Sequence, residues 1–306
     1  MAEIFQSGLG DLRLAAALHQ ELGVMLADRA SLWRHPAITF YGDLQGSGSD
    51  TLEVPLAGLD GFDRMVAVAE NASAANTALT DASPNLQIAR QALQRQISDL
   101  AVLTDSVGLT VERLASDMVG AAAMRFTELI ANVVDDFTTT VSDTGVDLSV
   151  AKFLDAVFAL TQASVTGPYI SILHPNQLTD LQGSLRSETG PIAQWVSATS
   201  EMMAIKGPGF AGQFVGVDLF ASSHIPTANA GADSAGCVMG LGAVGYAEGT
   251  PSALVGAGGF QVPAGSPFLI EFERDSSAAL TKIVGSYYVG VGIIEDGRGV
   301  SLITDR

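Results

Sequence analysis

The run from Leu109 to Thr140 constrains the fold most, because it predicts one unusually long amphipathic helix. Large apolar residues or small spacers recur there in steps of three and four, which places them on one stripe of a helix. The stripe consists of Leu114, Met118, Ala122, Phe126, Leu129, Val133 and Phe137. At 1.5 Å per residue the helix would be roughly 45 Å long, well above the usual globular length. Such a helix needs a sheet or other elements along its whole stripe.

The C-terminal part of the chain supplies the expected partners for that stripe. Phe268 to Arg274 alternates apolar and charged residues, and Thr281 to Ile294 predicts a long strand. Asp296 and Gly297 predict a hairpin turn into a last strand at Val300 to Thr304. We therefore expect these strands to cover the long helix.

The middle of the chain predicts alternating helices and strands. Asp147 or Ser149 is expected to cap a helix that buries Val150, Phe153, Leu154, Val157 and Phe158. Pro168 to Leu173 predicts a buried strand, and Pro175 begins a helix with Leu178, Leu181 and Leu185 inside. Further elements are expected in order: a helix at Thr189 to Met203, a glycine-rich loop at Lys206 to Gly212 and a strand at Phe214 to Ala221.

The N-terminal third reads differently. Gly10 to Ala30 predicts an amphipathic helix, and the extended segment after it is more typical of an arm than of a core. Asp60 to Asp99 contains few large apolar residues and cannot bury a core of its own. Within it, Leu86 to Ile97 is predicted to be extended or helical. The whole region is interpreted as a two-armed excursion whose partners lie elsewhere.

Charge excludes several function classes. The 306 residues include 15 Lys plus Arg against 33 Asp plus Glu, for a formal net charge of −18. Without a basic patch to displace counterions, direct grip on a nucleic-acid backbone is not expected. The most apolar stretch, Val284 to Ile294, is broken by Gly, Ser and Tyr, so no membrane span is predicted. The single cysteine, Cys237, excludes an intramolecular disulfide.

No catalytic, cofactor or metal site is predicted. Gly240 to Gly245 matches the dinucleotide fingerprint by letters, but a turn rather than a helix follows it. The four histidines are scattered without the spacing of metal ligands, and no Gly-x-Ser-x-Gly elbow is present. Asp135 and Asp136 are interpreted as a solvated helix flank.

Taken in order, these elements resemble the major capsid proteins of tailed bacteriophages with the Hong Kong 97-type capsid fold. Five stretches, which together span essentially the whole chain, carry the resemblance. They are Gln96 to Gly108, Val68 to Ala72, Leu173 to Pro175, Gly212 to Ala221 and Phe272 to Arg306.

The resemblance implies an α+β fold with an N-terminal arm at 1–44 and an extended loop region at 45–99. It also implies a peripheral domain at 100–144 and 266–306, where a spine helix lies on β-strands, and an α/β axial domain at 145–265. The implied protein is a structural one, not an enzyme. Its hexamers and pentamers would form the icosahedral head of a tailed phage in the host cytoplasm, enclosing double-stranded DNA without reading its sequence.

Two features bear on assembly. Some members of the family join subunits through a lysine in the extended loop that attacks an asparagine, but residues 60–99 contain no lysine, so no isopeptide bond is expected. Because the chain starts directly with the arm helix, we expect a separate scaffolding protein, besides portal and decoration proteins. The acidic charge either lines the container and repels DNA or faces a salty exterior.

Four charged residues of the loop region are predicted to contact neighbouring subunits, because charges on a segment without its own core need partners. They are Arg64, Glu70, Arg90 and Arg95. Two other functions stay open: an encapsulin-like nanocompartment shell, and an acidic extracellular hydrolase. The hydrolase would require a secretory signal and a nucleophile motif, neither of which the sequence shows.

Overall fold

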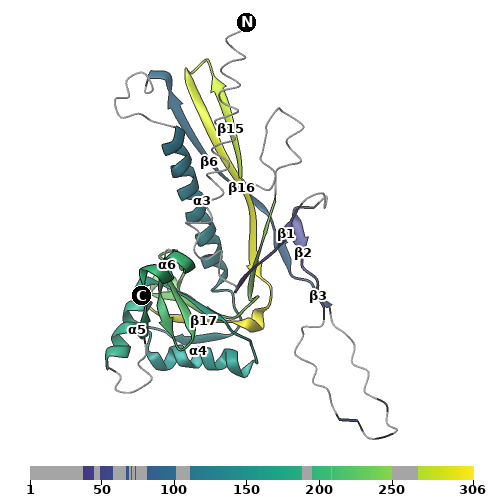
Figure 1. The fold of residues 1–306 in the computed structure, drawn as a ribbon, viewed down its shortest axis with the longest axis vertical. Helices are drawn as coiled ribbons and strands as arrows, with labels where there is room; N and C mark the ends of the chain where they lie inside the picture. The colour runs from purple at the N-terminus through teal and green to yellow at the C-terminus, as the bar shows by residue number, and fades with distance from the viewer. Residues whose placement is uncertain are drawn as a thin grey trace.

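The computed structural model describes residues 37–44, 49–57, 67–68, 70, 73, 81–100, 111–187, 195–207, 209–249 and 268–306. In the upper part of Figure 1, helix α3 (Val111–Val133) runs beside three long strands, β6 (Ala89–Ser98), β15 (Phe268–Asp275) and β16 (Leu280–Ile293). The remaining helices gather below around β17 (Gly299–Asp305). A narrow stem that includes β3 (Leu56–Ala57) leads away from both parts.

The first sheet is organised around β16. β15 and β14 (Val244–Glu248) pair with successive halves of β16, and β6 pairs antiparallel with it from Ala89 to Ser98. β1 (Ile38–Asp43) adds to β14 in parallel and forms the edge. The predicted strands at 268–274 and 281–294 are thereby confirmed.

The second sheet has eight strands in the order β7-β17-β13-β8-β11-β10-β9, with β12 beside β13. β13 lies near its centre and is buried along its whole length. The strands not yet given bounds are β7 (Thr140–Asp143), β8 (Tyr169–Leu173), β9 (Trp195–Ser197), β10 (Phe210–Phe214), β11 (Val217–Ala221), β12 (Thr227–Ala228) and β13 (Asp233–Met239).

The predicted hairpin at Asp296 and Gly297 is wrong. β16 belongs to the first sheet, whereas β17 pairs with β13 and β7 in the second. A short 3-10 turn at Asp296–Arg298 redirects the chain between the sheets. Gly299 then passes so close to Phe137 that an added Cβ would lie 2.1 Å from the ring, so only glycine fits there. Asp296 and Gly297 do form a turn, but which sheet β17 joins depends on long-range pairing.

Helix α3 covers the first sheet, but it ends at Val133 rather than near Thr140. Two acidic residues follow that end, where the helix dipole disfavours negative charge, and a run of threonines then favours extended chain. The stripe is confirmed at Met118, Phe126 and Phe137. Beyond Phe126 the buried row continues through Ile130 and Val134, while the predicted Leu129 and Val133 are only partly buried.

The helices of the second sheet agree in part with the prediction. Ser149 caps α4 (Val150–Gln162) by accepting a hydrogen bond from the Lys152 amide, as expected. Phe158 of α4 is 66% exposed, so its predicted burial is wrong. α5 (Pro175–Ser187) buries Leu181 and Leu185. The helix predicted at 189–203 is also wrong, because β9 and the short α6 (Ser200–Lys206) occupy its described part.

Other expectations can be compared only where the structure describes them. The strand predicted at 214–221 is two strands, β10 and β11, joined by a tight turn. Residues 86–97 are extended, in β5 (Asn85–Gln87) and β6. The predicted N-terminal helix at 10–30 lies outside the described residues. Among the described residues, no helix combines the length and apolarity that crossing a membrane requires.

Candidate functional site

The four predicted contact residues do not form one cluster. Arg64 lies outside the described residues, and Glu70 is exposed. Arg90 and Arg95 both belong to β6, five positions apart, so their side chains leave opposite faces of the sheet. Because β6 is a strand of the first sheet, both arginines have partners within the chain. Their roles between subunits stay a prediction.

Arg95 lies on the face that carries α3. Its Nε and Nη2 contact Asp117 Oδ2 at 2.9 and 2.8 Å, which joins β6 to the helix. Arg90 lies on the other face, where Nε and Nη2 donate to Ser286 Oγ at 3.0 and 2.8 Å. Glu271 lies 3.9 Å from the same guanidinium. Both ion pairs are about half exposed, so each stabilises the subunit by less than about 1 kcal/mol.

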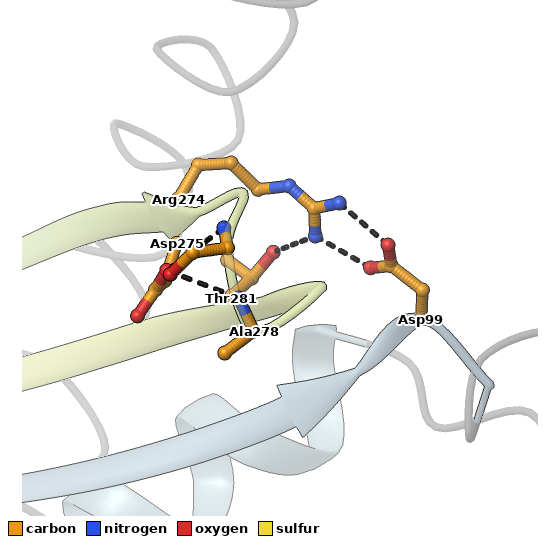
Figure 2. Close-up of polar contacts among 6 residues, drawn as sticks. Asp99, Arg274, Asp275, Ala278 and Thr281 are labelled. Carbon is orange, nitrogen blue, oxygen red and sulfur yellow. Dashed lines mark hydrogen bonds and ion pairs between the residues drawn. The ribbon is translucent and has the colours of Figure 1, made fainter.

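The far end of the first sheet is closed by a polar cluster (Figure 2). Arg274 of β15 donates from Nη1 and Nη2 to the two oxygens of Asp99 at 2.5 Å each, across the end of β16. Asp275 Oδ1 accepts from the Ser277 and Ala278 amides at 3.1 and 3.2 Å, which fixes the turn between β15 and β16. The Asp99 amide also donates to the Ala279 carbonyl. The last residue of the predicted loop region is therefore tied to this hairpin.

Hydrogen bonds within this cluster lower two carboxyl pKa values. The hydrogen bond from Arg274 holds the pKa of Asp99 below its ordinary value, and the bonds from Ser277 and Ala278 do the same for the pKa of Asp275. A depressed carboxyl pKa stabilises the fold above the ordinary aspartate value of about 3.9, and this contribution is lost as the pH falls through the lower, folded-state pKa. Both carboxylates are therefore charged at neutral pH, and the hydrogen bonds that hold this end of the sheet are formed.

The projecting stem is attached to the first sheet at β14 and the end of β16. β2 (Thr51–Glu53) pairs with β5, and β3 pairs with β4 (Asp81–Ala82), each as a separate two-stranded ribbon. A small apolar cluster of Val54, Leu86, Ile88, Ala247 and Ile294 anchors the base. At Gly290 of β16 an added Cβ would lie 2.4 Å from the Gln87 carbonyl oxygen, so the stem crosses β16 in direct backbone contact.

A partly buried carboxylate, that of Glu248, lies where β14 meets β16. Tyr287 Oη donates to Glu248 Oε1 at 2.9 Å. Burial, followed by the negative charge of Asp43, raises the pKa of Glu248, although the bond from Tyr287 acts in the opposite direction. A raised carboxyl pKa means that the folded state favours the protonated form. This contribution to stability is full below the ordinary glutamate pKa and is lost as the pH rises through the folded-state pKa.

We expect Glu248→Gln to stabilise the subunit increasingly as the pH rises, because the amide keeps an acceptor for Tyr287 but never becomes charged. The difference in melting temperature between variant and wild type should be near zero at pH 4 and reach roughly 2 °C at pH 7.5, the shift produced by about 1 kcal/mol. Thermal melts at several pH values measure it. A difference that does not change with pH would contradict the raised pKa.

Three features that could suggest chemistry can be checked in the described part of the chain. No group of His, Cys, Asp and Glu side chains there is arranged to hold a metal ion. Cys237 is fully buried, and burial raises the pKa of its thiol to about 12, so the thiolate that a nucleophile requires does not form at neutral pH. Gly240 to Ala243 connect β13 to β14, and Val244 and Gly245 already belong to β14. The turn predicted after Gly245 is therefore wrong, because a strand follows the glycines, but a helix does not follow them, as expected.

Sequence-based prediction missed two features, the partly buried Glu248 and the exposed apolar helix α6. No local sequence pattern indicates that Glu248 is partly buried, because its burial depends on the pairing of β14 with β1 and β16. Met202 and Met203 fall at the end of the helix predicted at 189–203, but the sequence predicts no exposed apolar face there. Instead α6 buries none of its residues.

Comparison with known proteins shows the fold. No protein-family model and no curated protein matches the sequence. Many solved structures match the fold. The head structure of Helicobacter pylori bacteriophage KHP40 superposes with a TM-score of 0.59 at 10% identity, covering 88% of this chain and 87% of that one.

Two matches come from other kinds of particle. The capsid of a native GTA particle gives a TM-score of 0.58 at 13% identity, over 90% of this chain and 91% of that chain. The holo-SrpI encapsulin complex from Synechococcus elongatus gives a TM-score of 0.56 at 14% identity, over 84% of this chain and 83% of that chain. The chain therefore has the mixed α/β, Hong Kong 97-type capsid fold, which confirms the resemblance seen in the sequence.

Proposed function

We propose that this chain is the major capsid protein of a tailed bacteriophage and assembles, as hexamers and pentamers, into an icosahedral head around double-stranded DNA. The capsid fold, with its matches to phage heads, is the observation that carries this proposal. Its role is structural rather than enzymatic, and its place is the virion after assembly in the bacterial cytoplasm. Scaffolding, portal and decoration proteins would be its partners.

The projecting stem supports assembly on physical grounds. β2–β5 packs on the first sheet, but β3–β4 beyond it is a two-stranded ribbon that pairs with no third strand among the described residues. An isolated two-stranded hairpin is marginally stable in water and becomes stable when it packs on another surface. A neighbouring subunit supplies such a surface in a closed shell. We propose the stem as the base of an extended loop that lies over the next copy.

The proposed domains follow the two sheets, except that several strands pair outside the domain to which their residue range assigns them. The peripheral domain at 100–144 and 266–306 holds α3, β15 and β16, and the axial domain at 145–265 holds most of the second sheet. However, β7 and β17 pair within the second sheet, whereas β14 pairs within the first, as does β6 from the proposed loop region at 45–99. These shared strands join the two domains into one unit, which suits a rigid shell tile.

An encapsulin-like shell is the second candidate, supported by the match to the holo-SrpI complex. Purification followed by sizing and negative-stain microscopy tests the shell itself, with closed particles or capsomer rings as the expected result. A stable compact monomer under all assembly conditions would contradict both candidates. Co-expression with a portal and packaging machinery separates them, because a phage capsid should then enclose nuclease-protected DNA.

Assembled shells should contain no covalent links between subunits. The reason is chemical: an isopeptide bond from the extended loop needs a lysine amine, and residues 60–99 contain none. Boiling particles in denaturant and separating them on a gel should give a single band at the monomer mass. A ladder of higher species that persists under reducing conditions would refute this prediction.

A further inference from the structure

Helix α6 presents apolar side chains to solvent although it is firmly held. Thr199 accepts a hydrogen bond from the Met202 amide at its start, and Lys206 Nζ contacts Asp218 Oδ1 at 2.5 Å at its end. The same ammonium lies 4.9 Å from the centre of the Phe210 ring. Met203 and Ile205 nevertheless remain exposed, Ile205 by 76%. The helix is thus a fixed apolar surface rather than a poorly packed part of the core.

Strand β9 extends this surface. It is the last strand of the second sheet and pairs with β10 alone among the described residues, so one edge of its backbone stays open. Val196 lies opposite Gln213, which in turn lies opposite Asp218, the partner of Lys206. Val196 therefore shares a face with the end of α6, and its side chain is exposed. We call Val196, Met203 and Ile205 the α6–β9 corner.

The turn after β10, at the end of that strand away from α6, is also unusual. Val215 joins β10 to β11 with φ of +50°, a left-handed conformation that is unfavourable for a β-branched residue. Its side chain is also exposed, so no core contact compensates for the strain. Strain and exposed apolar surface are each typical of a contact that forms only with a partner, so this turn is a second exposed apolar feature of the β9–β10–β11 part of the sheet.

Charge indicates which partner. The chain carries a net charge of −18, so two copies repel each other over most of their surfaces. Lys206 is paired with Asp218, β9 has no charged residue, and Glu201 at the start of α6 is the remaining charge of these two elements. The corner is thus one of the places where a second acidic copy can approach closely. A cationic partner would be better matched to the acidic remainder of the surface. A lipid surface would require basic residues around the apolar ones.

We propose that the α6–β9 corner is a contact surface between copies of this chain, where Met203 and Ile205 are buried against a neighbouring subunit and the open edge of β9 lies at the same junction. The proposal rests on the proposed shell function and adds to it the surface through which copies meet. Burying these side chains would also cover Val196.

Ile205→Asp tests the contact, with Phe158→Asp as the matched control on the exposed side of α4. Both positions are exposed in the subunit, by 76% and 66%, so both variants should fold with the melting temperature of the unassembled wild type. We expect Ile205→Asp to lower the assembled fraction at least tenfold and Phe158→Asp to leave it unchanged. Equal assembly of both variants, or an equal loss, would overturn the proposal.

Thiol labelling gives a second measurement that does not disturb the surface charge. Cys237 is buried and is the only native cysteine, so a new cysteine is labelled against a silent background. In Ile205→Cys a maleimide should react rapidly with free subunits and at least tenfold more slowly with shells. The same rate in both states would refute the contact alone. If wild-type protein never assembles, the proposed function and the contact both fail.

Discussion

Replacing Phe126 by aspartate is expected to leave the chain unfolded. The ring is 1% exposed and packs edge-on against Tyr246 of β14 at 5.5 Å between ring centres, with Tyr287 of β16 at 6.4 Å. Losing a buried phenylalanine costs about 3–5 kcal/mol, and an unpaired buried charge costs several more. The sum is comparable to the whole stability of a typical domain, roughly 5–15 kcal/mol. Phe126 therefore fastens α3 to the sheet.

Met124→Asp is the control, because it adds the same charge to the same helix two residues away. Met124 is 61% exposed, so this variant should be soluble and melt within about 2 °C of the wild type. Circular dichroism and the soluble yield after expression distinguish the two variants. Cooperative melting of Phe126→Asp near the wild-type temperature would show that α3 is not anchored at this ring.

Val133→Asp should destabilise the fold less than Phe126→Asp, although the predicted stripe places both residues on the buried face of the helix. The stripe places Val133 inside, but the structure leaves it partly exposed and buries Val134 completely. Spacing along a sequence locates the buried face of a helix to within about one residue, because 3.6 residues per turn lets the row drift. The existence of α3 could therefore be predicted, and so could most of its buried face. Its end could not, because it depends on Asp135, Asp136 and the chain after them.

The sheets show the complementary limit. Periodicity predicted β15 and β16, and a continuous apolar run predicted β8, because each pattern is local. Nothing local tells β17 to leave β16 and join β13, since that pairing joins residues far apart in the chain. The predicted contact arginines fail to cluster for the same reason: the partners of Arg90 and Arg95 come from β15, β16 and α3. Order along the chain identified the fold better than any single motif did.

Gln177→Leu is expected to destabilise the subunit by about 3 kcal/mol, because it removes the polar link between α5 and the second sheet. The side chain is fully buried, and its Nε2 donates to the carbonyls of Ser234 and Leu302 at 2.9 and 3.2 Å and to Thr304 Oγ1 at 2.8 Å. Its Oε1 accepts from the His174 amide at 3.1 Å. Leucine fills a similar volume but leaves these groups without that partner.

Asn176→Leu separates this loss from a general effect of leucine at the start of α5. Asn176 is exposed, so its replacement should change the melting temperature by no more than about 1 °C, whereas Gln177→Leu should lower it by roughly 6 °C. The fit around Gln177 is tight, since a Cβ added to Gly236 would lie 2.7 Å from its Oε1, and water therefore has little room to replace the amide. Equal melting temperatures for the two variants would mean that α5 is held by Leu181 and Leu185 alone. The expected difference would instead show that the buried Gln177 amide holds α5 to the strands β13 and β17 of the second sheet.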